Sequence, residues 1–327
     1  MAAALAAGAL SLAAGSSGGS PTRLAGCDVF PAFHGGASAP SGANESAWNQ
    51  DVSKAPLDPR SDGYTSRIKG LGGNQAVHPD FGGNGAYGIP YTTVGRSQPK
   101  VKVKVSPYGD QSDFGRAPIP SSAPVEGGSD RHVLVLQRGT CKLYELYAAH
   151  YLGGAGHRWH AASTARFDLG STALRHAGWT SADAAGLPIL PGLVRYPEVR
   201  HGRVGHAIRV TFAETRAAYI KPATHFASSQ CDKNLPPMGL RFRLRTGYFH
   251  HNLHRFPAGS QSRPIFKALY HYGIINADNG GAGANWFITG ASSKRWKDGD
   301  LNRLKSVPGS AFAVVKSAAK PTVSSSC

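Results

Sequence analysis

The chain has 327 residues, and 36 Lys and Arg against 19 Asp and Glu give it a formal net charge of +17. With 41% hydrophobic residues it can bury a sizeable core, which excludes a wholly disordered chain, while 41 Gly and 22 Pro favour turns over long helices. No apolar run of about 18 residues follows the N-terminus, so we expect no membrane span.

The N-terminal segment predicts export. Residues 1–25 are small and apolar and then rich in Gly and Ser, although the basic start of an ordinary signal peptide is missing, since Arg23 is the first charged residue. We interpret residues 1–25 as a signal peptide or a low-complexity leader, 26–318 as one β-rich globular domain and 319–327 as a tail. The expected location is extracellular.

Cysteine usage agrees with export. The chain has four widely spaced cysteines, Cys27, Cys141, Cys231 and Cys327. None has the spacing of a metal site, and an even number in an exported protein indicates two disulfides. The sequence allows three pairings, of which we expect Cys141 with Cys231 and Cys27 with Cys327. Free buried thiols are the alternative.

The predicted elements, in chain order, are mostly strands. Residues 25–95 and 106–130 are rich in Pro, Gly and Asn and indicate loops, whereas 132–137 and 141–147 flank a Gly-containing turn and predict a β-hairpin. Further strands are expected at 100–105, 158–168, 206–212, 217–221, 240–245, 274–275, 286–288 and 311–315, and short helices at 264–270 and 298–305. This order predicts a mainly β fold, a β-sandwich of the jelly-roll kind with a small C-terminal helical excursion.

Two of these strands alternate apolar and cationic residues. Residues 100–105 alternate Lys with Val, and residues 240–245 alternate Leu, Phe and Leu with Arg241, Arg243 and Arg245. A strand places such cations on one face, roughly 7 Å apart, which suits the repeated anionic groups of a polymer. The alternative is a solvated strand face on which lysine protects a sheet edge from aggregation.

Glu145 is the first candidate for catalysis. It shares a face of the predicted hairpin with Leu143 and Tyr147, and apolar surroundings would raise its pKa, as a general acid requires. A surface or ion-paired glutamate is the alternative interpretation.

A second group of candidates crowds the turn before the hairpin. Glu126, Asp130, Arg131 and His132 combine acids, a cation and a titratable base. We expect Glu126 or Asp130 to supply a second carboxylate, His132 to assist proton transfer and Arg131 to hold substrate. Acidic residues are also ordinary turn residues and partners of arginine, which is the structural alternative.

Other candidates are isolated. His206 is a possible proton-transfer residue and Trp159 a possible platform for a sugar ring, although an isolated histidine or tryptophan is more often structural. The same reservation applies to His78, Asp80 and His225. No HExxH, GxSxG, P-loop or GxGxxG pattern occurs, so we expect no metal and no cofactor.

Several motifs resemble a known family when taken together in their order. They are HPDFGGNGAYGIPY, EGGSDRHVLVLQRGTCKLYELY, TSADAAGLPILPGLVRY, GHAIRVTF, PATHFAS, LPPMGLRFRLR and YGIINADNG. The chain resembles, over residues 47–315, an uncharacterised family of predicted secreted, mainly bacterial proteins. The resemblance implies export and a single domain, and it transfers no catalytic residue.

The interpretation favoured by the sequence is a secreted carbohydrate-active protein that acts on a neutral or acidic extracellular polysaccharide. As an enzyme it would be a glycoside hydrolase or a polysaccharide lyase, since paired carboxylates about 5–10 Å apart suit glycoside hydrolysis. The alternatives are a non-catalytic lectin-like or polyanion-binding surface protein and a structural wall or matrix protein. No module for specific nucleic-acid binding is recognised.

Overall fold

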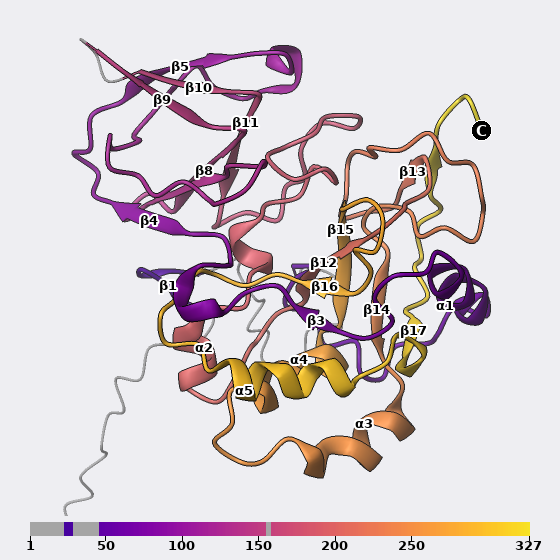
Figure 1. Cartoon of the computed structure of the whole chain (residues 1–327). Helices are drawn as coiled ribbons and strands as arrows, with labels where there is room; N and C mark the ends of the chain where they lie inside the picture. Colours follow the sequence, from indigo (N-terminus) through magenta and orange to yellow (C-terminus); the bar gives the residue numbers. More distant parts are fainter. Residues whose placement is uncertain (1–22, 29–45, 155–157) are drawn as a thin grey trace, which may run out of the picture.

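The structure, a computed structural model, describes residues 23–28, 46–154 and 158–327 (Figure 1). The predicted leader lies outside these residues up to position 22. The described strands form one six-stranded sheet, two four-stranded sheets and two small two-stranded sheets. The mainly β class is therefore confirmed.

Two four-stranded sheets lie together in the upper left of Figure 1. The first has the order β11-β8-β7-β4 and contains the predicted hairpin, in which β7 and β8 are antiparallel. The second has the order β6-β5-β10-β9. Their bounds are β4 Tyr91–Val94, β5 Val101–Val105, β6 Arg116–Ala117, β7 Val133–Gln137, β8 Lys142–Tyr147, β9 His150–Gly153, β10 Arg158–Ala161 and β11 Ser163–Asp168.

The six-stranded sheet has the order β17-β14-β15-β12-β16-β3. Its bounds are β3 His78–Pro79, β12 Ile208–Phe212, β14 Arg241–Leu244, β15 Ile274–Asn279, β16 Phe287–Ile288 and β17 Phe312–Val314. β12 lies inside this sheet, parallel to β15 and antiparallel to β16. Four of the five residues of β12 are buried, and Thr211, which is half-buried, lines the cavity described below.

The helices are α1 Ser61–Gly70, α2 Tyr196–Arg200, α3 Thr246–Asn252, α4 Ser262–His271 and α5 Asp298–Leu301. The predictions at 264–270 and 298–305 correspond to α4 and to α5 with the 3-10 turn that follows it. The expectation that helix is confined to the C-terminal part is wrong, because α1 lies in a region predicted as loop. Tyr64 and Ile68 of α1 are buried, and the Ser61 hydroxyl accepts a hydrogen bond from Val314 N.

The core has three parts, and one of them joins the sheets. Leu136 and Phe167 from the first four-stranded sheet pack in the same cluster as Ile275 and Ala277 from the six-stranded sheet. A second cluster lies between the six-stranded sheet and the helices, and a third lies between the two four-stranded sheets. The shared cluster holds the sheets at a fixed distance, and this fixes the walls of the site described below.

The jelly-roll expectation is not confirmed, because a jelly roll is antiparallel and four strand pairs here are parallel. These are β4 with β7, β5 with β10, β12 with β15, and β3 with β16. The predicted strand 158–168 is also divided at Ala162, since β10 belongs to one four-stranded sheet and β11 to the other.

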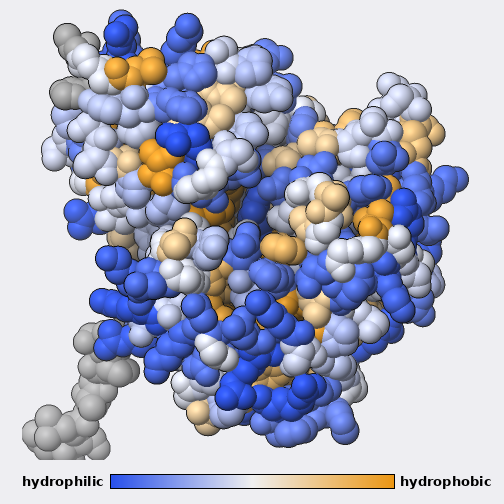
Figure 2. Space-filling view, viewed as in Figure 1, coloured by the Kyte–Doolittle hydropathy of each residue, from blue (hydrophilic) through white to orange (hydrophobic). Residues whose placement is uncertain are grey.

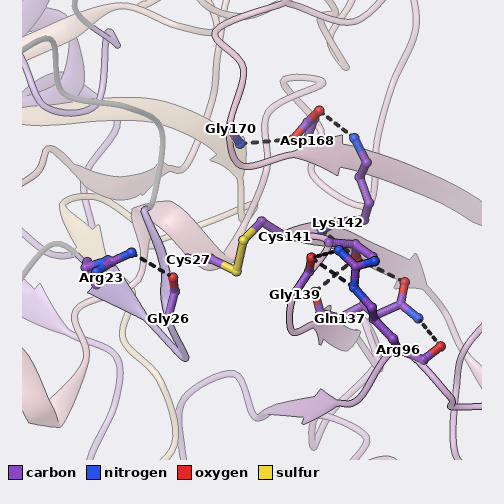
Figure 3. The surroundings of a disulfide bond; sticks show 11 residues. Arg23, Gly26, Cys27, Arg96, Gln137, Gly139, Cys141, Lys142, Asp168 and Gly170 are labelled. Atoms are coloured by element: carbon purple, nitrogen blue, oxygen red, sulfur yellow. Dashed lines mark hydrogen bonds and ion pairs between the residues drawn. A yellow bond between two sulfur atoms is a disulfide. The ribbon is translucent and has the colours of Figure 1, made fainter.

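Two disulfides are present, but the expected pairing is wrong. Cys27 is bonded to Cys141 at the turn between β7 and β8, and Cys231 is bonded to Cys327. Figure 3 shows the first bond, which attaches β1 (Arg23–Leu24) and β2 (Cys27–Asp28) to the hairpin turn. The second attaches β18 (Thr322–Val323), which pairs with β13 (Ala218–Tyr219), so residues 319–327 are part of the folded structure.

In the ranges that the structure describes, no helix combines the length and the apolar character that a membrane span needs.

Candidate functional site

A cavity of about 490 Å³ opens between the first four-stranded sheet and the six-stranded sheet. Figure 2 shows the molecule hollowed between these two parts. One wall comes from the residues before β7 and the end of β8, a second from β12, β15 and β16, and the third from the loop over residues 180–184. Its volume falls in the range of small-ligand sites, which is about 300–1,000 Å³.

The cavity is acidic although the protein is basic. It is lined by five of the chain's 19 acidic residues, Asp80, Glu126, Asp130, Asp183 and Asp278. Arg209 is the one Lys or Arg side chain among the described residues that line it. Three of the residues singled out as candidates from the sequence, Glu126, Asp130 and His132, line this cavity.

Glu126 and His132 form an ion pair at the start of β7. His132 Nδ1 donates to Glu126 Oε2, and His132 Nε2 donates to the Ala182 carbonyl at 3.0 Å. Burial alone would lower the pKa of His132, but the hydrogen bond to Glu126 and its charge raise it. Burial alone would raise the pKa of Glu126, but the bond from His132 and its charge lower it. Glu126 is therefore held ionised, and its Oε1 has no hydrogen bond to a described residue.

The pKa of Asp80, which follows β3, is shifted in the opposite direction to that of Glu126. Its side chain reaches solvent at the cavity rim, yet the surrounding wall removes part of its hydration, and this partial burial raises its pKa. His78 acts in the opposite direction, and the charge of Glu126 adds to the rise. The two carboxyls thus share one cavity, and their pKa values are shifted in opposite directions, that of Asp80 upward and that of Glu126 downward.

Arg209 of β12 occupies the base of the cavity between two carboxylates. Its Nε donates to Asp183 Oδ2, and its Nη2 lies 2.7 Å from Asp278 Oδ2. Burial alone would lower the pKa of Arg209, but the charges of Asp183 and Asp278 raise it. Burial, opposed by the charge of Arg209, raises the pKa of Asp183 to about 6. This pairing fixes the base of the cavity.

Two further polar groups face the cavity. His225 Nδ1 donates to the Ala184 carbonyl at 2.8 Å, and burial lowers its pKa, so the ring is neutral and Nε2 is a hydrogen-bond acceptor. The hydroxyl of Tyr147 makes no hydrogen bond within the described ranges, and burial raises its pKa. Both atoms are available to a ligand.

The structure places Glu145 outside the cavity. Its side chain is completely buried, and its carboxylate accepts hydrogen bonds from the backbone N–H groups of Ile189 and Leu190 at 2.9–3.0 Å. Burial raises its pKa to about 7, although these two donors lower it. The sequence was right to expect a raised pKa, but the carboxylate holds the loop behind the cavity and does not face a ligand.

Three other predicted residues also lie elsewhere. Arg131 Nε donates to the Ala149 carbonyl, and Trp159 is 1% exposed in the core between the two four-stranded sheets, so it offers no ring to a sugar. His206 is 1% exposed and lies 3.3 Å from Glu198, whose carboxylate also pairs with Arg195. These residues are structural.

The arginine strand does not display its cations as expected. Leu240, Phe242 and Leu244 are buried as predicted, but Arg243 is buried too and donates to the Leu244 carbonyl. Arg245 pairs with Asp62, and Arg241 is half-buried. Arg243 is covered because its guanidinium lies over the ring of Tyr270 in α4 and donates to the Ala55 carbonyl. Lys102 and Lys104 are exposed, but β5 is not at a sheet edge.

No three His, Cys, Asp or Glu side chains among the described residues are placed to hold a metal ion. No protein-family model matches the chain, and comparisons with curated proteins and with solved structures find no match. The site is therefore interpreted from its own chemistry.

Proposed function

We propose that the chain is a secreted glycoside hydrolase that binds a neutral glycan in the acidic cavity. The observation that carries this proposal is the pair formed by Asp80 and Glu126, two carboxyls in one cavity whose pKa values are shifted in opposite directions. Groups separated in this way divide the acid and base roles of a hydrolytic reaction between them.

The roles follow from the two environments. Asp80 would donate its proton to the oxygen of the departing sugar. Glu126, ionised by His132, would act through its free Oε1 in one of two ways: as a base that takes a proton from the water attacking the anomeric carbon, or as a nucleophile that bonds to this carbon and is later released by water. His225 Nε2, the Tyr147 hydroxyl and Arg209 Nη1 are the groups that would orient sugar hydroxyls.

The charge of the cavity supports a neutral sugar over an acidic one. Five carboxyls face two cationic groups, Arg209 and His132, and each of these cations is already paired with a carboxylate. A polysaccharide lyase must neutralise the carboxylate of its uronic acid before it removes the neighbouring proton. With Arg209 engaged by Asp183 and Asp278, the lyase alternative has less support.

Export is part of the proposal. Two disulfides are typical of proteins that fold in oxidising compartments, and the N-terminal sequence has the small apolar character of a leader. We also propose that the chain belongs to the family of secreted, mainly bacterial proteins whose motifs it shares.

The test is release of reducing ends from a panel of neutral polysaccharides. We expect Asp80→Asn and Glu126→Gln each to reduce turnover about 10²–10⁴-fold with the fold intact by circular dichroism. Asp62→Asn is the matched control, because its side chain is 87% exposed on α1, outside the cavity. If the wild type releases nothing but binds a glycan whose affinity falls in Asp80→Asn, the cavity is a lectin-like binding site.

A further inference from the structure

A second hollow, separate from the cavity, runs between α2 and the side of α4. Two adjoining depressions of about 420 and 340 Å³ share Gly202, Pro264 and Lys267 and so form one groove, here called the basic groove. It is lined by five Lys and Arg side chains, Arg200, Arg203, Arg263, Lys267 and Lys297.

The acidic residues of the groove do not neutralise these cations. Asp51 pairs with His271, and Asp300 accepts the backbone N–H of Gln261 and lies 3.7 Å from Arg303. By contrast, the exposed cations of Arg200, Lys267 and Lys297 have no hydrogen bond or ion pair with any residue that the structure describes. Three unpaired cations around one hollow produce a local positive potential that attracts anions.

We propose that the basic groove binds a chain of an acidic polysaccharide. Its ligand carries repeated carboxylate or sulfate groups, and it lies across α2 and α4 rather than entering the acidic cavity. The groove and the cavity are lined by different elements and carry opposite charge. The groove therefore anchors the protein to an anionic matrix, independently of whether the cavity hydrolyses a glycan.

The lining of the groove favours a polysaccharide over nucleic acid or a lipid surface. Its two tyrosines, Tyr196 and Tyr272, are partly buried and pack against the core, and His271 is paired with Asp51, so the groove has no unengaged ring on which a base could stack. The large exposed apolar residues in the described ranges, among them Leu152 and Leu174, are not in the groove. Membrane insertion would need such residues there.

The experiment measures binding of polygalacturonate, dextran sulfate, uncharged dextran and a 20-nucleotide single-stranded DNA to the full chain at low and at physiological salt. We expect both acidic polysaccharides to bind more tightly than dextran, with affinity that falls as salt rises. The stronger of the two identifies the preferred anionic group. Dextran that binds as well as either, or DNA that binds more tightly than both, would overturn the proposal.

Charge-reversal variants locate the site. Arg200→Glu with Lys267→Glu should weaken polysaccharide binding about tenfold, since each reversal removes one attraction and adds one repulsion. Lys102→Glu with Lys104→Glu changes the net charge equally on exposed residues of β5 and is the matched control. Equal losses in the two variants would show that general charge is responsible and contradict the proposal. Arg200→Gln with Lys267→Gln repeats the test with a milder change.

Discussion

The imidazole of His132 is held between the carboxylate of Glu126 and the carbonyl of Ala182, so both of its ring nitrogens are occupied. His132 therefore cannot itself accept a proton from a ligand. Its effect is on Glu126, which it keeps ionised while leaving one carboxylate oxygen free. In the proposed hydrolase His132 would therefore be a positioning residue, and Glu126 would perform the chemistry.

The first prediction concerns the pH dependence of turnover. In the proposed hydrolase Glu126 acts ionised and Asp80 acts protonated, so kcat/KM should fall below the lowered pKa of Glu126 and above the raised pKa of Asp80. The profile should be bell-shaped. His132→Gln should move the acid limb to higher pH, because it removes the charge that lowers the pKa of Glu126. An acid limb that stays in place in this variant would contradict the role given to His132.

The second prediction concerns Arg209. Arg209→Met leaves Asp183 and Asp278 without their cation and should lower the free energy of unfolding by about 3–5 kcal/mol at pH 8. The loss should be smaller at pH 5, where Asp183, whose pKa is raised, takes up a proton. Urea unfolding at both pH values measures this. Arg245→Met is the control, since its partner Asp62 is exposed, and it should cost less than about 1 kcal/mol.

The third prediction concerns Glu145. A carboxyl whose pKa rises from 4.5 to about 7 on folding binds its proton more tightly in the native state, so stability falls as pH rises through this range. Between pH 4.5 and 7 the wild type should lose about 3 kcal/mol of its free energy of unfolding through this residue. Glu145→Gln has no such group to titrate, so its plot of unfolding free energy against pH should be flatter. Turnover should be unchanged. A hundredfold loss of turnover in a folded variant would show that Glu145 takes part in the reaction and contradict its assignment as a residue that only holds the loop.

The fourth prediction concerns Gly273, which joins α4 to β15. Its φ of +72° is unfavourable for other residues, and an added Cβ would lie 2.1 Å from the Phe242 carbonyl oxygen. Gly273→Ala should therefore destabilise the protein by about 2–4 kcal/mol in thermal or urea unfolding. Gly70→Ala, at the end of α1 with open space around it, is the control and should change stability by less than about 1 kcal/mol.

Local patterns predicted individual elements well but not how these assemble. The hairpin of β7 and β8 was evident because two apolar strands flank a Gly-containing turn. The division of residues 158–168 at Ala162 was not, because nothing in the local sequence marks where a strand leaves one sheet for another. α1 was missed because its Ser- and Gly-rich sequence has only two large buried residues, Tyr64 and Ile68.

The same limit applies to the site. Glu126, Asp130 and His132 were found because they are close together in the chain. The other charged residues of the cavity come from segments up to about 200 residues apart, and only the packing of the sheets brings them together. They are Asp80, Asp183, Arg209 and Asp278. Asp80 and His225 are candidates from the HPDFGG and PATHFAS segments. Because each is isolated in the chain, nothing near it favours a catalytic or binding role over a structural one. For Arg243, alternation correctly predicted the strand but not that α4 would cover the guanidinium.

The cysteines pair in chain order, the first with the second and the third with the fourth. In a chain that crosses a membrane N-terminus first, Cys27 and Cys141 can therefore join before Cys231 has emerged. No other cysteine lies between the two partners of either bond, so pairing in the order of emergence gives the native bonds. Such a protein should mature with an oxidant alone and depend little on disulfide isomerases.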